Sequence, residues 1–334
     1  MSRLVFVGSV NADTIAVVPR LPGSDERLLA DSVVHAGGGN SATAAVAAAR
    51  LGGDVAFIGP VADDDQGKRI RADLVREGVD TSGLVPVPAG TGGASVVLVD
   101  RTEGTRAICT RPLTAFGIPD TPHAARDLIA GARWVHADHV GWAAVRPLLA
   151  LGDAAGAIRG AGAGTDGPRL SVDAGNPIPG FRPAGVDLYG PTVVSLRRAY
   201  GDLPVADLLA RALGDGASCV VATDGARGAY AAGDPFAREL TAPGVAARDG
   251  QGDVRGEAVH VPGFTVDVVS TLGAGDVFHG ALLVAVDRGL DRRSALRYAN
   301  AVAALSCRAI DGRSGVPTDA EVSSWLADMS ASGA

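Results

Sequence analysis

The sequence predicts an α/β fold: a three-layer αβα sandwich with a mostly parallel central sheet, accompanied by a small β-sheet lid. Short apolar runs alternate with amphipathic stretches along most of the chain, which is the pattern of parallel strands joined by helices. In two places, strand-like segments instead follow each other without a helix between them. Strands connected in that way form hairpins, so a second, smaller sheet is expected.

The elements of the main sheet are predicted from the periodicity of apolar residues. Strands are expected at residues 4–7, 55–59, 134–136, 170–172, 193–195 and 219–222. Helices are expected at residues 41–51, 66–77, 124–130, 205–213, 276–287, 292–308 and 318–329. The last three helices follow one another, so we expect the chain to close with a helical layer.

The lid is predicted from two strand pairs, residues 14–18 with 27–34 and residues 94–100 with 105–110. We therefore assign residues 11–34 and 91–111 to the lid. The α/β core comprises residues 1–10, 35–90 and 112–334. Two glycine-rich stretches, 160–167 and 247–256, are expected to be surface loops.

Composition argues against several kinds of partner and site. The net charge of −7 disfavours a nucleic-acid partner, because phosphate backbones are bound by basic surfaces. No run of about 18 apolar residues is present that would span a membrane. The 3 cysteines are odd in number and far apart, which indicates reduced thiols in the cytoplasm. No histidine or cysteine spacing indicates a structural metal.

Two common nucleotide-binding motifs are missing. A P-loop needs Gly-Lys followed by Ser or Thr, but Lys68 is the only lysine and Arg69 follows it. A nicotinamide dehydrogenase needs Gly-x-Gly-x-x-Gly after the first strand, where Gly8-Ser9-Val10-Asn11 stands instead. Any phosphate-binding site in this protein would therefore have to be formed by other residues.

The most informative segment runs from residue 265 to residue 283. Its β-branched residues predict a strand, which enters a turn of small residues and then an apolar helix with Asp276 in its first turn. Gly273, Ala274 and Gly275 let backbone N–H groups converge, and the helix dipole adds positive potential at the same point. The segment therefore predicts a carboxylate that accepts a proton beside a site that binds anionic groups.

Two segments near the N-terminus predict a second half of this site. Asn11 and Asp13 follow the first strand, at the edge of a parallel sheet where ligands bind. Taken alone, this pattern is more often an Asx turn than a binding site. Farther along, Gly37, Gly38 and Gly39 precede an alanine-rich helix, and such glycines let the backbone approach a ligand.

These segments resemble the two signatures of the PfkB sugar-kinase family, also called ribokinase-like. The resemblance implies a ribokinase-like fold, with ATP as co-substrate and Mg²⁺ as the accompanying metal. Asp276 would deprotonate the sugar hydroxyl, and Gly273, Ala274 and Gly275 would hold the transferring phosphoryl group. The second signature is matched at Ser270, Thr271, Gly273, Ala274, Gly275, Asp276, Gly280 and Ala281. The implied sugar contacts are Asn11, Asp13, Gly38, Gly39, Asn40 and Thr43, of which Thr43 replaces the family's usual asparagine.

The nucleotide site is also implied by the resemblance. Without it, Asp224-Gly225 between apolar runs is typical of a hairpin turn. The family's Asn-x-x-Glu magnesium motif is replaced by residues 195–198, Ser-Leu-Arg-Arg, so no metal ligand is assigned. Ser270 stands where the family commonly has an aspartate, so the resemblance does not decide whether a monovalent cation binds. The implied nucleotide contacts are Thr223, Asp224, Gly225, Gly228, Ser195 and Thr271.

Within the family, the sequence is most similar to 6-deoxy-6-sulfofructose kinases and next to ketohexokinases, through residues 37–52, 277–281 and 312–317. This likeness implies phosphoryl transfer to a primary hydroxyl, C1 of a ketose. A sulfonate needs several cationic or polar donors. The candidates are Arg27, Thr110, Arg111 and His139, although the two arginines are equally typical of solvated charges on edge strands.

Other functions stay open at this point. The acceptor is alternatively a neutral sugar such as fructose or ribose, or a nucleoside. A different class of protein, a non-catalytic sugar- or nucleotide-binding protein, would use the same fold, but the Asp276 motif counts against it. Family members often pair through their lids, so the resemblance implies a homodimer, with no nucleic-acid or membrane partner expected.

Overall fold

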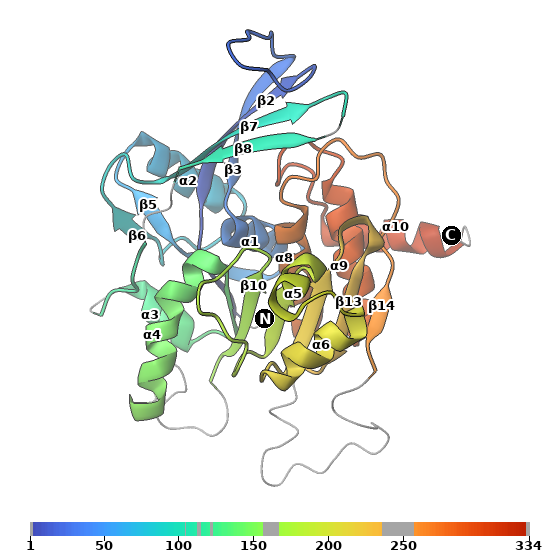
Figure 1. Ribbon diagram of the computed structural model, residues 1–334. Helices are drawn as coiled ribbons and strands as arrows, with labels where there is room; N and C mark the ends of the chain where they lie inside the picture. Colours follow the sequence, from blue (N-terminus) through green and yellow to red (C-terminus); the bar gives the residue numbers. More distant parts are fainter. Residues whose placement is uncertain are drawn as a thin grey trace.

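The computed structural model describes residues 3–103, 105–111, 115–120, 123–155, 167–235 and 257–331. Its body contains an eight-stranded sheet in the order β14-β13-β12-β11-β10-β9-β1-β4 (Figure 1). From β12 to β4 all neighbours are parallel, whereas β13 and β14 extend one edge as antiparallel strands. The predicted mostly parallel sheet is therefore confirmed. The strands are β1 (Arg3–Val7), β4 (Asp54–Ile58), β9 (Trp134–Ala137), β10 (Arg169–Ala174), β11 (Leu188–Pro191), β12 (Cys219–Thr223), β13 (Ala229–Gly233) and β14 (Val259–Val261).

Helices cover both faces of this sheet. In β1, Leu4 and Phe6 pack on one face while Val5 and Val7 pack on the other, as is typical of a parallel sheet between two helical layers. The first face is covered by α1 (Asn40–Arg50), α2 (Asp65–Arg76), α8 (Ala274–Asp287) and α9 (Arg292–Ser306). The second is covered by α3 (Ala124–Ala130), α4 (His139–Ala155), α5 (Val193–Tyr200) and α6 (Val205–Gly214). The last helix, α10 (Asp319–Ala331), contacts α9.

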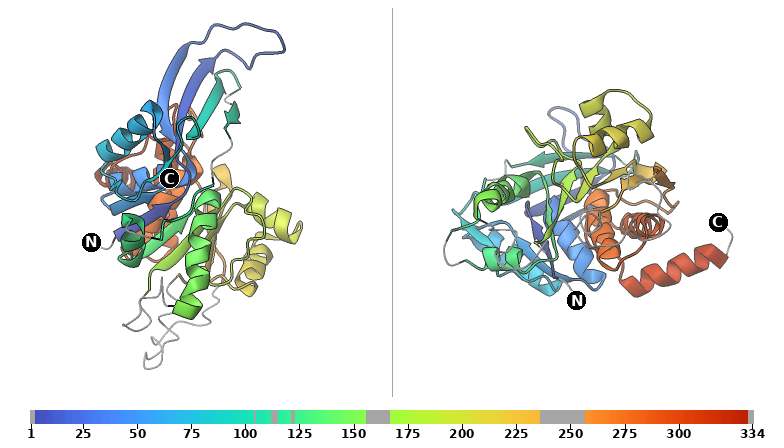
Figure 2. Two further views of the ribbon diagram at one scale, coloured as in Figure 1. Left: turned by 90° about the vertical axis from the view of Figure 1, so that its left-hand side faces the viewer. Right: turned by 90° about the horizontal axis from the view of Figure 1, so that it is seen from below.

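A four-stranded sheet stands away from the body as a lid (Figure 2). Its order is β3-β2-β7-β8, and only the central pair β2 and β7 is parallel. The strands are β2 (Asn11–Val18), β3 (Ser32–Gly38), β7 (Gly93–Asp100) and β8 (Arg106–Thr110). β3 thus runs on to Gly38, past residue 34, and Arg27 lies in the loop before it. Two short strands, β5 (Pro60–Ala62) and β6 (Val85–Val87), pair beside α2.

One predicted strand, residues 193–195, is wrong. The strand ends earlier, at Pro191, and α5 begins at Val193. Thr192 Oγ1 accepts a hydrogen bond from the Ser195 N–H at 2.9 Å, which caps the new helix. Val193 and Val194, the β-branched residues that suggested a strand, therefore lie in the first turn of α5.

The strand expected before the Asp276 turn is also absent from the described structure. β14 ends at Val261, and Pro262 has no N–H with which to continue the ladder. The Val269 and Ser270 N–H groups instead donate to the Cys307 carbonyl at 2.8 and 3.1 Å. The end of α9 thus anchors this segment where a strand was expected.

Some predictions cannot be compared with the structure. Residues 247–256, and residues 160–166 of the other glycine-rich stretch, lie outside the described residues. Among the helices that are described, none combines the length and the apolarity needed to cross a bilayer.

Candidate active site

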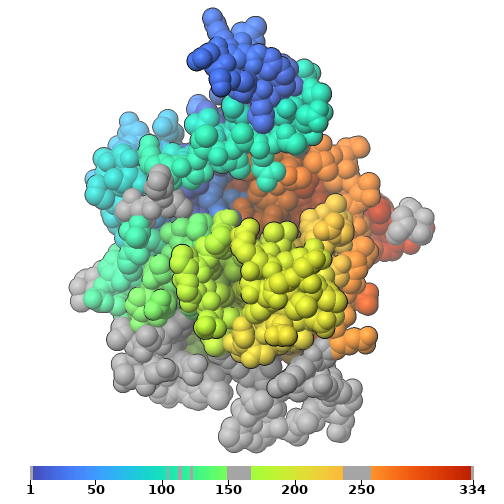
Figure 3. Space-filling model, in the orientation of Figure 1, coloured from blue at the N-terminus to red at the C-terminus, as the bar shows by residue number. Residues whose placement is uncertain are grey.

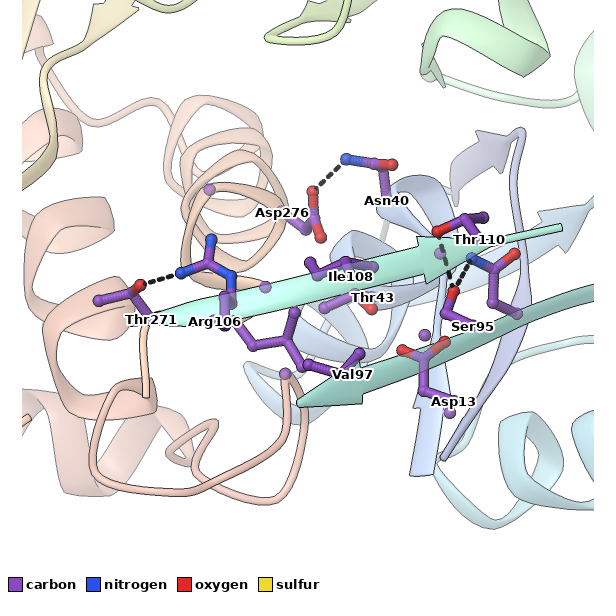
Figure 4. A pocket seen from close by; sticks show the side chains of 18 of the residues that line it. Asp13, Asn40, Thr43, Ser95, Val97, Arg106, Ile108, Thr110, Thr271 and Asp276 are labelled. Atoms are coloured by element: carbon purple, nitrogen blue, oxygen red, sulfur yellow. Dashed lines mark hydrogen bonds between the residues drawn. The ribbon is translucent and has the colours of Figure 1, made fainter. Parts of the chain in front are cut away.

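A cavity of about 410 Å³ lies between the lid and the body, and Figure 3 shows the recess beneath the lid strands. The lid strands contribute Asn11, Asp13, Gly37, Gly38, Ser95, Val97, Arg106, Ile108 and Thr110. The body contributes Gly39, Asn40, Thr43, Asn176, Thr271, Leu272, Gly273, Gly275, Asp276 and Gly312. Most of the predicted sugar contacts and the Asp276 turn therefore meet in one space (Figure 4).

The turn before α8 brings backbone N–H groups to the cavity. Gly273, the residue at the helix N-terminus, has φ 73°, a left-handed conformation that favours glycine. A Cβ atom there would lie 2.8 Å from Gly312 Cα, so the two loops pack too closely for a side chain. No side chain caps α8, which leaves N–H groups of its first turn available to an anion. Ala274 is the exception, because its N–H donates to the Thr271 carbonyl at 3.3 Å and the residue does not line the cavity.

Asp276 lies in the first turn of α8 and faces Asn40, which begins α1 (Figure 4). The Asn40 side-chain amide donates to Asp276 Oδ1 at 2.8 Å. Burial, together with the nearby Asp173 carboxylate, raises the pKa of Asp276 to about 8, although the Asn40 hydrogen bond opposes this shift. A carboxyl group with that proton affinity is suited to general-base chemistry near neutral pH.

Asn11 and Asp13 begin β2, where the lid joins the body, and both are buried. The Asn11 amide nitrogen donates to Ser95 Oγ at 3.3 Å. In contrast, neither Asn11 Oδ1 nor Asp13 Oδ1 has a hydrogen-bond partner within the described residues. Buried acceptors are rarely left unpaired, so these two oxygens indicate a ligand that donates hydrogen bonds, such as one with several hydroxyl groups.

Arg313 supports this part of the cavity from below, although sequence reasoning gave it no role. Its Nη2 donates to the Gly38 carbonyl at 2.7 Å, and its Nε donates to Thr43 Oγ1 at 3.3 Å. Burial lowers the pKa of Arg313 to about 10, and the Asp13 charge opposes this effect. The sequence signal was a single arginine inside an otherwise uncharged Gly-Ser-Gly-Val-Pro turn.

A methyl group at Gly38 would strike the carboxylate of Asp13, the predicted sugar contact, because an ideal Cβ there lies 2.0 Å from Asp13 Oδ2. We expect Gly38→Ala to raise the KM for the sugar by about tenfold or more, since small misplacements at a site are costly. Steady-state kinetics measures this effect. Gly23→Ala in the lid is the matched control, because its nearest contact would be an ordinary 3.6 Å to Glu26. An unchanged KM in Gly38→Ala would argue against Asp13 as a sugar contact.

Asp138, at the end of β9, is another functional neighbour that the sequence did not reveal. It is fully buried, and its carboxylate accepts hydrogen bonds from Ser9, Ser41, Val140 and Gly141, including the Ser9 hydroxyl at 2.6 Å. The carboxylate thus joins the end of β1 to the starts of α1 and α4. It fixes the segments that carry Asn11 and Asn40.

Among the predicted nucleotide contacts, only Thr271 lines the cavity. Thr223 is the last residue of β12, and Asp224, Gly225 and Gly228 lie in the connection to the antiparallel β13, so the hairpin interpretation of Asp224-Gly225 is correct. Ser195 Oγ donates to the Gly175 carbonyl at 3.1 Å, next to the cavity residue Asn176. Thr192 forms a β-bridge with Thr223, so Ser195 and Thr223 both lie near the carboxyl ends of the neighbouring strands β11 and β12.

Three of the four predicted sulfonate donors do not line the cavity. Arg27 is exposed in a lid loop, Arg111 donates to the Gly90 and Gly92 carbonyls, and His139 begins α4. Only Thr110 faces the cavity, together with Arg106, which sequence reasoning overlooked. Side chains alternate along a strand, so placing Thr110 inward also places Arg106 inward and Arg111 outward. The alternation of side chains along this strand is the sequence pattern from which Arg106 could have been predicted.

Comparison with known proteins agrees with this geometry. The model of the pfkB family carbohydrate kinases matches residues 1–149 and 182–319. An ATP-dependent ribose-1-phosphate kinase of Halopiger xanaduensis is 32% identical over 98% of this chain and 99% of its own length. A ribokinase of Bacillus subtilis is 28% identical over 98% of this chain and 100% of its own.

A solved structure gives the fold. The ribokinase of Arabidopsis thaliana complexed with ribose and ATP superposes with a TM-score of 0.74 at 22% identity, covering 97% of this chain and 98% of that one. The ribokinase-like fold is therefore confirmed, whereas special closeness to sulfofructose kinases or ketohexokinases stays a prediction. The family match spans most of the chain, and we conclude that this protein belongs to the pfkB family of carbohydrate kinases, which are phosphotransferases.

Proposed function

We propose that the chain transfers the γ-phosphoryl group of ATP to a primary hydroxyl of a sugar, C1 in the case of a ketose. The observation that carries this proposal is that Asp276, Asn11 and Asp13 line one cavity, where one side-chain oxygen of Asn11 and one of Asp13 have no hydrogen-bond partner among the described residues. A sugar supplies hydroxyl donors for the two acceptors and a further hydroxyl for Asp276. A silent binding protein would need only the acceptors.

The reaction proceeds as an in-line displacement at the γ-phosphorus. The sugar oxygen forms a new bond to phosphorus while the bond to the β–γ bridging oxygen breaks, and ADP leaves with that electron pair. Asp276 takes the proton of the attacking hydroxyl. The N–H groups at the start of α8 stabilise the charge on the transferring group, and the lid excludes water from the cavity.

ATP is proposed to lie along the sheet edge that carries Ser195, Thr223 and the turn from Asp224 to Gly228. Mg²⁺ neutralises phosphate charge when it is bound. In the described part of the chain, no group of three or more His, Cys, Asp or Glu side chains is arranged to hold a metal ion. We therefore propose that Mg²⁺ enters with the phosphate oxygens of ATP, since Mg²⁺ in such sites keeps few protein ligands.

The acceptor that we propose is a sugar with neighbouring hydroxyl groups, whether a ketose or a pentose. The sulfofructose prediction depends on Arg27, Arg111 and His139, and their positions away from the cavity weigh against it. 6-Deoxy-6-sulfofructose therefore serves as one test substrate among several. A nucleoside is a further test substrate.

We also propose a homodimer that forms through the lid. Among the strands that the structure describes, the outer strands of the lid sheet, β3 and β8, each pair with only one other. Val33 and Val96 of the lid are exposed at 58% and 51%, which adds apolar surface. Light scattering during gel filtration measures the oligomeric state directly.

The proposed function is tested by ADP release with fructose, ribose, 6-deoxy-6-sulfofructose, ribose 1-phosphate and adenosine, each with MgATP. Turnover of any sugar supports the proposal and identifies the acceptor. Turnover of adenosine alone would establish a nucleoside kinase instead. ATP and sugar binding by calorimetry without turnover would favour the silent binding protein.

The pKa of Asp276 predicts the pH dependence of the reaction. The active form is the carboxylate, so kcat/KM is expected to rise about tenfold per pH unit below the pKa of about 8 and to level off above it. Initial rates from pH 6 to pH 9.5 with both substrates below their KM measure this profile. Asp173→Asn removes the neighbouring charge and should move the rise to lower pH. A flat profile over the same range would argue against Asp276 as the base.

A further inference from the structure

A buried hydroxyl holds the start of α1 against the end of β1. Ser9 lies two residues after β1, is only 1% exposed, and its Oγ accepts the Asn40 N–H at 2.9 Å. The same Oγ donates to Asp138 Oδ2 at 2.6 Å, so its hydrogen is committed to the carboxylate and a lone pair is left for Asn40. The first N–H groups of a helix have no partner within the helix, and Ser9 supplies one for α1.

Asp138 fixes the orientation of the Ser9 hydroxyl. Its Oδ2 accepts from the Ser9 hydroxyl and from the N–H groups of Ser9 and Ser41, at 2.6, 2.8 and 3.2 Å. Its Oδ1 accepts from the N–H groups of Val140 and Gly141, at 2.9 and 2.8 Å. The carboxylate cannot turn away from Ser9 without losing several of these bonds, and each lost bond would leave a buried donor unpaired.

The side chain of Asn40 carries this arrangement to Asp276. Its Nδ2 donates to Asp276 Oδ1 at 2.8 Å, and its Oδ1 accepts from Asn176 Nδ2 at 3.4 Å (Figure 4). Three hydrogen bonds of 2.6, 2.9 and 2.8 Å thus link Asp138, Ser9, Asn40 and Asp276 in that order. Neither Ser9 nor Asp138 lines the cavity, so both act on the site only through the residues that do.

Several groups determine how strongly Asp276 holds a proton. Burial is the largest cause of its raised pKa, and the hydrogen bond from Asn40 opposes the rise. The charged side chains that also act on this pKa are Asp173 and Asp138, which raise it, and Arg313, which lowers it. Among these effects, the Asn40 bond depends on the position of α1 that Ser9 fixes. A displaced Asn40 would therefore leave Asp276 with a still higher proton affinity.

We infer that Ser9, oriented by the buried Asp138 carboxylate, is a positioning residue for the base of the reaction and acts through Asn40. The inference rests on the proposed function, in which Asp276 takes the proton of the sugar hydroxyl. Asn40 occupies Asp276 Oδ1, so Oδ2 is left to accept that proton at a fixed place. Small misplacements of a reacting group are costly, which gives the Ser9 hydroxyl an effect on rate.

The first test is Ser9→Ala, which removes the hydroxyl while Asp138 keeps four backbone N–H donors. We expect kcat to fall by about tenfold with an unchanged KM for ATP. The rise of kcat/KM with pH should move to higher pH, because the bond that lowers the pKa of Asp276 is weakened. The matched control is Ser171→Ala, which removes another buried hydroxyl, bonded to His136 Nδ1 at 2.9 Å. It should keep the wild-type kcat and pH profile even if it unfolds at a lower temperature.

A double-variant cycle tests whether Ser9 acts through Asn40. Ser9→Ala added to Asn40→Ala should lower kcat by less than about twofold, because the side chain that Ser9 positions is already gone. Losses that multiply in the double variant would overturn the inference. So would a Ser9→Ala enzyme with the pH profile of the wild type, since a purely structural serine would change stability alone.

Nuclear magnetic resonance supplies a readout that does not depend on turnover. The side-chain amide signal of Asn40, identified by its loss in Asn40→Ala, should shift as Asp276 titrates, with a midpoint near its pKa of about 8. We expect a higher midpoint in Ser9→Ala, and an equal midpoint would contradict the inference. Absence of sugar turnover by the wild-type protein would count against the proposed function alone, because this titration would still report on Ser9. Thermal unfolding of each variant identifies any loss of folding.

Discussion

Asp276→Asn is expected to lower kcat by about a thousandfold, because loss of a positioned general base typically costs two to four orders of magnitude. The substitution keeps the size of the side chain, and the amide oxygen still accepts the hydrogen bond from Asn40. Binding of ATP and sugar should therefore change little. Steady-state kinetics gives kcat, and calorimetry gives the two affinities.

Asp267→Asn is the matched control for this variant. Asp267 is an exposed carboxylate in the segment that leads to the same turn, and it does not line the cavity. Its variant should retain wild-type kinetics. If Asp276→Asn kept more than about a tenth of the wild-type kcat, proton transfer by this residue would be excluded as a major part of the rate.

Asp13→Ala is expected to raise the KM for the sugar by about a hundredfold, with a much smaller effect on the KM for ATP. Hydrogen bonds to a charged group contribute about 1.5–3 kcal/mol each, and the Asp13 carboxylate is placed to accept from sugar hydroxyls. Burial raises the pKa of Asp13, so its ionised form is destabilised in the free protein. Hydrogen bonds donated by a bound ligand would stabilise that form. Kinetics at saturating ATP measures the effect.

The control for Asp13→Ala is Asp31→Ala, which removes an exposed lid carboxylate that pairs with Arg101. It should leave both KM values unchanged. Equal losses in the two variants would mean that Asp13 acts through lid stability and not through sugar binding. Thermal unfolding of both proteins separates these effects.

Periodicity predicted the main sheet and its helices well, because both depend on apolar patterns that burial enforces. Residues 124–130 were predicted as a helix, and α3 has these bounds. The errors occurred where one local contact decides the outcome. At Val193, Thr192 caps a helix that begins with β-branched residues. Before Asp276, the N–H groups of Val269 and Ser270 donate to the Cys307 carbonyl at the end of α9 and not to a neighbouring strand.

Candidate site residues were predicted best where glycines and a carboxylate stand close together in sequence, as at Gly273 and Asp276. Contacts between distant segments could not be predicted in the same way. Arg313 reaches Gly38 from 275 positions away, and no local pattern specifies that approach. Arg27 was chosen from its place in a family pattern, but it lies in a loop before β3, where strand alternation does not direct its side chain.

The pairing register of the lid strands places Asp13 and Arg106 at different distances from the body. Asp13 is the third residue of β2, next to the body, and Arg313 holds the neighbouring Gly38 in place. Arg106 pairs through Val99 with Val17, four residues farther out, or roughly 13 Å along the strands. A rotation about the root of the lid would therefore move Arg106 much farther than Asp13. Such a motion would break the hydrogen bond between Arg106 and Thr271 while it left Asp13 close to its place beside the body.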